Sequence, residues 1–439
     1  MDQYEDMSTA TRECLTVVKE PARTSLAYLV SEYPGVSHTF ILREISRLRA
    51  MKCDIRVASI NQCRRPAAQM TEEERREIAA TYYVKSAGVS GALRAHWFVI
   101  ASRPVAYLCG LGFALRLAGG DIKRLLFAIF YFVEAVMLGR WMERQGLHHV
   151  HVHFANPAAQ VALIASRVFA IRYSLTVHGP DEFYDTQGHN LTEKVAGASF
   201  VCCISYFAIS QLKLLSPPSE WSKFELTPLG VDPKVFAPCP FRFVPEPFEI
   251  LCVGRLVAAK GQHILIEAID RLIHKDFRVR LRLIGDGPER EPLELEVRRR
   301  GLGEHVIFEG SVNQDRIREF YRGADAFVLA SFAEGVPVVL MEAMAMEIPC
   351  VTTYVGGIPQ LIQNEVDGLL VAPSDVNALT SAIERLIGDP ALRIRLATAA
   401  RERVFKHYNL GPNVSRLRAI FDTRLAAQGV NMVTASARP

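Results

Sequence analysis

Short apolar runs alternate with amphipathic helical patterns along almost the whole chain. Runs typical of buried parallel strands lie at 25–30, 54–60, 149–154, 174–179, 200–205 and 224–230, and again at 248–254, 279–287, 306–310, 326–331, 349–354 and 367–371. Helical patterns between them include 37–51, 158–170, 260–275, 313–322 and 375–388. Because parallel strands need crossover connections, this alternation predicts an α/β fold of doubly wound parallel sheets.

A proline-rich segment divides the chain into two halves. Its prolines, at 233, 238, 240, 245 and 247, exclude a regular element there. A length of 439 residues suits two or three domains. We therefore expect a doubly wound domain over 23–235, a linker over 236–247, a second doubly wound domain over 248–410 and a last helix over 411–428; the resemblance described below implies that both domains are Rossmann-like. The ends, 1–22 and 429–439, are expected to be disordered tails.

The region from Trp97 to Trp141 is apolar but carries scattered charges. Each of its apolar runs is shorter than the ~20 residues that a spanning helix requires. We expect two amphipathic helices with basic edges and no transmembrane helix. The helices either pack on the first domain or dip their aromatic side chains into an anionic membrane surface, and the residues alone leave both alternatives open.

Composition narrows the class of protein. The net charge of +4 is weak evidence about partners, and no dense basic patch with interleaved aromatic residues indicates nucleic acid. The nine cysteines include no C-x-x-C pair, which favours reduced thiols in a cytoplasmic protein over disulfides or a zinc framework. The acidic, polar N-terminus does not resemble a signal peptide.

A carboxylate stands inside an apolar helical pattern at 336–346. Glu342 follows Glu334 by eight residues, and the strand-like run at 326–331 places Glu334 at the carboxyl end of a sheet, where open α/β folds bind ligands. An unpaired buried charge costs several kcal/mol, so Glu342 needs a partner. Either an arginine of the chain or a bound ligand would supply it.

Two cations follow a strand of the second half. The strand ends at Gly254, Arg255 comes next, and Lys260 stands just before the following helix. Cations beside a helix N-terminus suit phosphate, although two solvated loop charges would also explain them. The turn at 284–288, I-G-D-G-P, either lets a ligand approach the backbone or is a plain turn.

Histidines stand near strand ends of the first half. His178 precedes a Gly-Pro turn and would face the crevice between the domains, although a lone histidine at a strand end is more often structural. His149, His151 and His153 alternate along one strand and share a face. This pattern could suggest a metal, but the intervening valines favour an ordinary strand, and we expect no metal site.

Four motifs together resemble one known family. They are P-G-x-S-x-T-F-I (34–41), H-G-P-D (178–181), G-R-x-x-x-x-K-G (254–261) and E-G-V-P-V-V-L-M-E-A-M-A (334–345). Over about residues 25–425 the chain resembles the retaining GT-B glycosyltransferases of family 4, of the bacterial exopolysaccharide and colanic-acid type. The resemblance implies that the first domain binds the acceptor, that the second holds a nucleotide sugar, and that the last helix crosses back to the first domain.

The resemblance also implies an activity. A hexosyl group would move from a UDP-sugar, or alternatively a GDP-sugar, to a hydroxyl of a lipid-linked saccharide, with retention of configuration. The enzyme would work in the cytoplasm or on the inner face of the membrane, with no cofactor or metal.

Residue roles follow from the same resemblance. Arg255 and Lys260 would grip the donor diphosphate, with Gly35 and Gly254 beside it. Glu342 would bind the ribose, and His178 would lie near the reaction centre. The sugar hydroxyls would contact Glu334 and the residues after it, Gly335, Val336 and Pro337.

Two positions depart from the family pattern, and two alternatives stay open. His38 stands where relatives often carry glutamate, and Glu347 where many carry glycine. A GT-B nucleotide-sugar epimerase would share the fold and the donor. A non-catalytic membrane-surface subunit of a polysaccharide assembly would have lost nucleotide binding.

Overall fold

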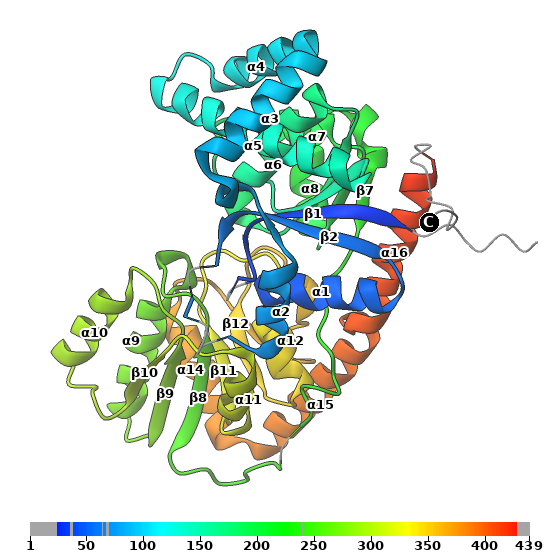
Figure 1. Cartoon of the computed structure of the whole chain (residues 1–439). Coiled ribbons are helices and arrows are strands. Elements are labelled where there is room, and N and C mark those ends of the chain that lie inside the picture. The colour runs from blue at the N-terminus through cyan, green and yellow to red at the C-terminus, as the bar shows by residue number, and fades with distance from the viewer. Residues whose placement is uncertain (1–23, 36–37, 64, 67–69, 239, 428–439) are drawn as a thin grey trace, which may run out of the picture.

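The computed structural model describes residues 24–35, 38–63, 65–66, 70–238 and 240–427. The expected tails, 1–22 and 429–439, lie outside these residues. The described chain forms two domains, each built on one parallel sheet (Figure 1). This confirms the predicted α/β class.

The first sheet has seven strands in the order β3-β2-β1-β4-β5-β6-β7. Their bounds are β1 Ser25–Tyr33, β2 Asp54–Gln62, β3 Tyr82–Tyr83, β4 His149–His153, β5 Arg172–Val177, β6 Val201–Cys203 and β7 Phe224–Leu226. The predicted strand runs of this half are all present, whereas β3 was not predicted because two residues carry no periodic signal. The order reverses between β1 and β4, which makes a topological switch point there.

The second sheet has six strands in the order β10-β9-β8-β11-β12-β13. They are β8 Phe248–Val253, β9 Val279–Ile284, β10 Val306–Gly310, β11 Ala326–Leu329, β12 Cys350–Thr353 and β13 Leu369–Val371. The run Phe-Glu-Ile-Leu-Cys of β8 is buried throughout, as expected for a strand covered by helices on both faces. Here the switch point lies between β8 and β11.

Helices connect the strands and cover the sheets. In the first domain they are α1 Thr39–Ala50, α2 Glu72–Ala80, α6 Pro157–Val168, α7 Leu191–Gly197 and α8 Tyr206–Leu215, beside α3 to α5. In the second domain they are α9 Gln262–Ile273, α10 Arg290–Arg299, α11 Gln314–Arg322, α12 Val338–Ala345, α13 Ile358–Leu361, α14 Val376–Gly388 and α15 Pro390–His407.

The region of the two expected amphipathic helices contains three. They are α3 Gly88–Ser102, α4 Pro104–Ala118 and α5 Ile122–Gln145, and they extend from the first domain on the side away from the second (Figure 1). The prediction of two helices is wrong because Pro104 begins a new helix after Arg103, and Asp121 caps the next by accepting from the backbone N–H of Arg124.

One of these helices is long. Among the described residues, α5 with its 24 residues is the single helix long and apolar enough to cross a membrane by length and composition, and α3 and α4 pass the test only as a pair bent by 120°. Glu134 interrupts the apolar sequence of α5, so the helix passes this test only with a charged residue inside the window, and the expectation of no transmembrane helix stays a prediction. Half of its most apolar window is buried inside the fold, as also happens in core helices.

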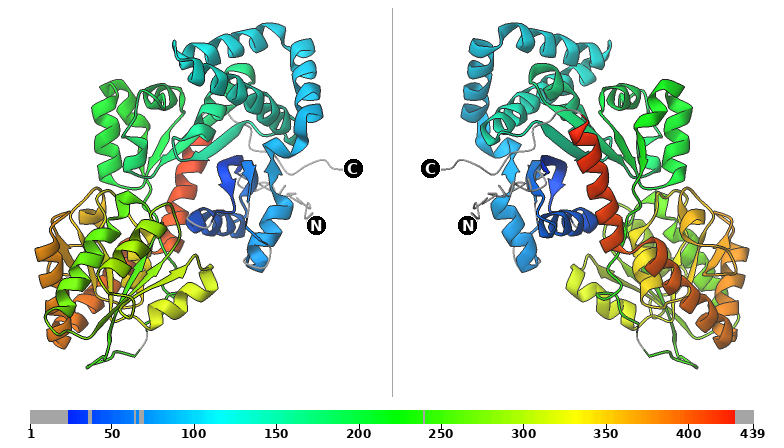
Figure 2. Two further views of the ribbon diagram at one scale, coloured as in Figure 1. Left: turned by 90° about the vertical axis from the view of Figure 1, so that its left-hand side faces the viewer. Right: turned by 90° about the vertical axis from the view of Figure 1, so that its right-hand side faces the viewer.

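The last helix, α16 (Leu410–Ala426), packs on the first domain beside α1 (Figure 2). Phe421 of α16 is fully buried and meets the rings of Tyr28 and His151, with centroids 6.4 and 5.0 Å away. Arg424 Nε donates to the Glu225 carboxylate at 2.9 Å. The chain thus returns to its first domain after completing the second.

Candidate functional site

A cleft of about 760 Å³ lies between the two domains. Its walls include the segments that follow β5, β8, β9 and β11, together with the start of α1 and of α12. Both domains therefore contribute the residues after their strands, where open α/β sheets bind ligands.

The wall formed by the second domain carries two cations, Arg255 and Lys260, beside the carboxylates of Asp286, Glu334 and Glu342. Lys260 stands just before α9, and its Nζ lies 2.5 Å from Glu334 Oε1, which also accepts from Ser331 Oγ at 2.7 Å. Between Lys260 and α9, Gly261 has φ 60°, and a Cβ there would lie 2.2 Å from the carbonyl oxygen of Ala330. Only glycine fits, so the loop can turn tightly into α9 directly after Lys260, which lines the cleft.

Arg255 stands opposite the first domain. Its side chain is 58% exposed, and Nη2 lies 4.0 Å from Asp181 Oδ2. An exposed pair at that distance contributes at most about 1 kcal/mol. Arg255 is therefore free to turn toward an anion in the cleft.

Glu342 lies in α12 and is almost fully buried. Oε1 accepts from Arg43 Nη1 at 2.9 Å, and Oε2 accepts from the Tyr321 hydroxyl at 3.0 Å. Burial and the adjacent carboxylate raise the pKa of Tyr321 well above its usual value, which keeps the hydroxyl a donor. An arginine of the chain thus pairs with Glu342, one of the two partners foreseen, and it comes from the opposite domain.

The loop after β5 is held by a buried carboxylate. Glu182 accepts from the backbone N–H groups of His178, Gly179 and Ala155 at 2.5, 2.9 and 2.5 Å. Burial raises the pKa of Glu182 to about 7, and burial lowers the pKa of nearby Lys194 to about 7. Lys194 donates to the Ala155 carbonyl oxygen at 2.8 Å, which completes the support of the loop.

The His178 ring is enclosed by aromatic side chains. Its centroid lies 4.2 Å from that of Phe154 and 5.0 Å from that of Phe40. Burial, reinforced by neighbouring histidines, lowers the pKa of His178 well below its usual value, so the ring is neutral. A neutral imidazole can accept one hydrogen bond while it donates another.

The two domains touch at this loop. A Cβ on Gly335 would lie 1.9 Å from the carbonyl oxygen of His178. The backbones therefore meet directly, and no other residue type fits at 335 without a shift of one loop. This contact brings His178 to the wall that carries Glu334.

The predicted site residues are brought together with one exception. His178, Gly254, Arg255, Lys260, Glu334, Gly335, Val336, Pro337 and Glu342 all line the cleft. Gly35 is not among the described lining residues, although it lies beside His38, which does line the cleft. Residues 36 and 37 of the same motif lie outside the described residues. Of the turn at 284–288, residues 284 to 286 reach the cleft.

The two departures from the family pattern have distinct surroundings. Burial, helped by Arg255, lowers the pKa of His38 to about 4, so a neutral ring faces the cleft. Glu347 has φ 55°, a conformation that glycine adopts most easily, and its carboxylate lies 3.6 Å from Arg401 Nε.

Several lining residues were not predicted. Arg43, Arg65 and Glu74 reach the cleft from the first domain, and Phe40 and Phe154 surround His178. Nothing local distinguishes Arg43 from the other arginines of its helix. Ser331, which donates to Glu334, could have been predicted, because it ends the strand-like run at 326–331 that precedes Glu334.

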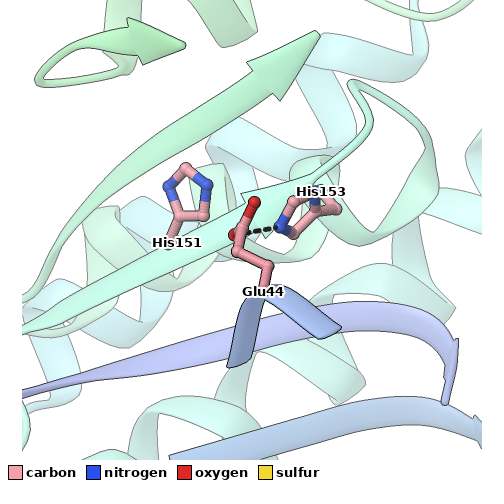
Figure 3. Close-up of side chains that lie close together, drawn as sticks. All are labelled: Glu44, His151 and His153. Carbon is pink, nitrogen blue, oxygen red and sulfur yellow. Dashed lines mark hydrogen bonds and ion pairs between the residues drawn. The ribbon is translucent and has the colours of Figure 1, made fainter. Parts of the chain in front are cut away.

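One group of side chains could hold a metal ion by position. Glu44, His151 and His153 offer ligand atoms within 4.8 Å of one another, and all three are buried (Figure 3). Both ring nitrogens of His151 are already engaged, with Ser174 Oγ and Thr176 Oγ1, each at 2.8 Å. The ring nitrogens of His151 that a metal ion would need are thus already occupied by hydrogen bonds within the protein.

The second domain matches a known family model. Residues 240–403 match the family described as glycosyl transferases group 1. The match covers β8 to α15, which carry Arg255, Lys260, Glu334 and Glu342.

Relatives and solved structures extend the comparison. The chain is 29% identical over 290 residues to TuaC of Bacillus subtilis (strain 168), named as a teichuronic acid biosynthesis glycosyltransferase, covering 62% of this chain and 70% of TuaC. It is 33% identical over 215 residues to WcaL of Escherichia coli (strain K12), named as a colanic acid biosynthesis glycosyltransferase, covering 47% of this chain and 52% of WcaL. The chain thus spans about half the length of WcaL.

The whole fold has a close structural counterpart. The structure of HepE from Anabaena in complex with UDP-glucose superposes with a TM-score of 0.70 at 17% identity, covering 91% of this chain and all of HepE. At this identity the likeness shows the fold. The match of residues 240–403 to the group 1 glycosyl transferases supports a transferase activity, and the described chain, with its two parallel-sheet domains, shares the overall fold of HepE.

Proposed function

We propose that this enzyme, as a family 4 glycosyltransferase, moves a hexosyl group from a nucleotide diphosphate sugar to a hydroxyl of a lipid-linked saccharide, with retention of configuration. A UDP-sugar is the favoured donor and a GDP-sugar the alternative. The observation that carries the proposal is the joint placement of Arg255, Lys260 and Glu334 in a cleft at the switch point of the second sheet.

The two cations of this wall suit a leaving diphosphate. As the glycosidic bond to the donor breaks, negative charge grows on the phosphate oxygens, and preorganised positive groups stabilise it. Arg255 and Lys260 supply full charges, and the N-terminus of α12, whose first residues line the cleft, supplies a partial one. We therefore assign the diphosphate to this wall and include no metal ion in the proposal.

The carboxylates suit hydroxyl groups. Glu334 faces the cleft beside Lys260, and a carboxylate in that position can accept from hydroxyls of the transferred sugar. Glu342 would accept from the ribose hydroxyls of the nucleotide. Arg43 now holds Glu342, so ribose binding requires Arg43 to move or to share the carboxylate.

A lipid-linked acceptor is supported by an exposed apolar surface on α3 to α5, here called the apolar crest. Its exposed members are Val89, Leu93, Trp97, Phe98, Ile100, Val105, Leu108, Ile122, Leu125, Leu126, Phe127, Ile129 and Phe130. Large exposed apolar patches mark interaction surfaces, and exposed Arg94, Lys123 and Arg124 lie on the same helices. This combination fits an anionic bilayer. We place the enzyme on the cytoplasmic face of the membrane.

The decisive experiment is a thermal-shift panel with UDP, GDP, ADP and their sugar conjugates. A ligand at 100 times its Kd stabilises the folded protein by about 2.7 kcal/mol, which raises the melting temperature clearly. A response selective for one base identifies the donor. A cooperative melt with no response to any nucleotide contradicts the proposal and favours the non-catalytic subunit.

Products separate transfer from epimerisation. Incubation of the enzyme with the responding donor and a polyprenyl-diphosphate saccharide should give an extended glycolipid, and NMR of the new anomeric centre tests retention. A changed sugar that forms without acceptor would instead identify an epimerase.

A further inference from the structure

A chain of buried side chains runs from the cleft into the first domain. His178 Nε2 lies 3.0 Å from His153 Nδ1, and His153 Nε2 lies 3.1 Å from Glu44 Oε1. The same carboxylate oxygen accepts from the Tyr28 hydroxyl at 2.7 Å. Figure 3 shows Glu44 on α1 facing His153 on β4, with their contact drawn as a dashed line.

These four side chains are shielded from water, so they form their hydrogen bonds within the protein. His153 and Tyr28 are fully buried, and Glu44 and His178 are each 7% exposed. Burial of a polar group without a partner is costly, which favours arrangements in which every donor meets an acceptor.

The contacts of these side chains fit the following arrangement of hydrogens. Glu44 Oε1 accepts from Tyr28, and it also accepts from His153 if that ring carries its hydrogen on Nε2. With that hydrogen on Nε2, the Nδ1 atom of His153 is left to accept from His178 Nε2–H. A neutral His178 with its hydrogen on Nε2 has a bare Nδ1.

The Nδ1 atom of His178 has no hydrogen-bond partner among the described residues, and the residue lines the cleft. Phe154 packs against the ring of His178. Its backbone has a φ of 68°, a strained conformation for a bulky residue. Both the orientation of the ring and the state of its free nitrogen are therefore determined from inside the domain.

We propose that Glu44 and His153 are positioning residues that hold His178 in the tautomer with hydrogen on Nε2, so that Nδ1 accepts a hydrogen bond from a hydroxyl of the transferred sugar. The contact with the sugar rests on the proposed function. The tautomer itself does not, because it is a property of the free protein.

The first test reads the tautomer directly. Long-range proton–nitrogen NMR of the full-length chain with nitrogen-15-labelled histidine should show His178 with hydrogen on Nε2. His153→Leu should abolish that single state, whereas Ser174→Ala should preserve it. Ser174→Ala is the matched control, because it removes two buried hydrogen bonds of 2.8 Å, to His149 and His151, on the same sheet. A wild-type His178 with hydrogen on Nδ1 would overturn the proposal, whether or not the enzyme is active.

The second test reads the consequence for turnover. His153→Leu and Glu44→Met should each lower kcat roughly tenfold or more, since a hydrogen bond in the transition state is worth about that factor. Glu44→Gln, which keeps an acceptor oxygen, should stay near wild type. The Kd for the free nucleoside diphosphate should not change in any of these variants. A folded His153→Leu with wild-type kcat would overturn the positioning role.

A metal at Glu44, His151 and His153 is the competing explanation for the same side chains. Metal analysis of the purified full-length protein distinguishes the two. One equivalent of bound zinc that Glu44→Met removes would overturn the hydrogen-bond chain, because His153 Nε2 cannot donate and bind a metal together. A sub-stoichiometric metal content agrees with the proposal.

Discussion

Arg43 and Glu342 form an ion pair of 2.9 Å across the cleft, although they belong to different domains. Arg43 also donates to Gln314 Oε1 at 3.3 Å and packs over the Phe236 ring. The pair therefore connects α1 to the second domain, and it occupies the carboxylate that we assign to the ribose.

Removal of either partner should destabilise the free enzyme. The side chains are only 17% and 8% exposed, so loss of one partner leaves a poorly hydrated charge, at a cost of about 2–4 kcal/mol. Urea unfolding of Arg43→Ala, Glu342→Ala and the double variant measures this. We expect the double variant to lose less than the sum of the single losses, and strict additivity would exclude a coupled pair. Glu342→Ala should also weaken nucleotide binding at least tenfold, whereas Arg43→Ala should not.

Lys260→Ala should reduce turnover at least tenfold, and it should also destabilise the free enzyme because it leaves the buried Glu334 carboxylate without its cation. The lysine faces the proposed diphosphate, and one preorganised charge contributes roughly 10²–10³-fold to kcat in comparable sites. Steady-state kinetics with the identified donor checks this prediction. Lys275→Ala is the matched control, since that lysine pairs with Glu384 on the outer surface of the same domain. Equal effects of both substitutions would remove Lys260 from the site.

Gly335→Ala should impair activity while the domains stay folded. Its added Cβ would meet the carbonyl oxygen of His178, so the two loops must move apart. We expect a loss of kcat of tenfold or more, because misplacement of about 1 Å can cost 10²-fold. Gly303→Ala serves as the control, because a Cβ there meets nothing within 4 Å. Wild-type kinetics for Gly335→Ala would show that the loop contact is dispensable.

Stability should fall as the pH drops below 6.5. Burial lowers the pKa of His149 to about 3 and that of His178 well below 6.5, so the folded state excludes protons that the unfolded state binds. Each contributes stability that is present above pH 6.5 and is lost toward its folded pKa, at about 1.4 kcal/mol per pH unit. Glu182 has the opposite effect. Because its folded pKa is raised to about 7, the folded state binds a proton more readily than the unfolded state, and this group adds stability as the pH falls from 7 to 4.5.

Urea unfolding at pH 7.5, 6.5, 5.5 and 4.5 measures this dependence. The variant His149→Gln should reduce the slope below pH 6.5 by about one proton, that is about 1.4 kcal/mol per unit. A slope that this substitution does not change would mean that His149 binds protons equally in the folded and unfolded states, so that burial does not lower its pKa.

The apolar crest should bind anionic vesicles. Replacing Trp97, Leu108 and Phe130, which are 74%, 65% and 61% exposed, by serine should reduce co-sedimentation with phosphatidylglycerol vesicles. Nucleotide binding should be unaffected because these residues lie outside the cleft. Leu214→Ser, at an 80% exposed position on α8, is the control. Equal vesicle binding by wild type and the triple variant would contradict membrane docking by this surface.

The alternation of strand and helix patterns was sufficient to predict the fold class, because burial on both faces of a parallel strand leaves a local signature. The same reasoning failed between Trp97 and Trp141. There, a proline and a capping aspartate divide an apolar stretch into three helices, and continuous apolar sequence does not reveal where one helix ends.

In the candidate site, too, some features could be predicted from the sequence and others could not. Arg255, Lys260, Glu334 and Glu342 could be predicted because each lies within a few residues of a strand or helix end, so that local sequence determines its position. Which arginine meets Glu342 depended on the tertiary structure, since Arg43 lies 299 positions away and its place is set by how the domains pack.

The sequence by itself therefore determined most strands, the α/β class and several residues that line one wall of the cleft, since those follow from local periodicity and turns. Only the tertiary structure decided the helix boundaries between Trp97 and Trp141, the contacts between domains and the hydrogen bonds that join His178, His153 and Glu44. Such contacts depend on the register and packing of elements far apart in the sequence, and short-range patterns do not encode them.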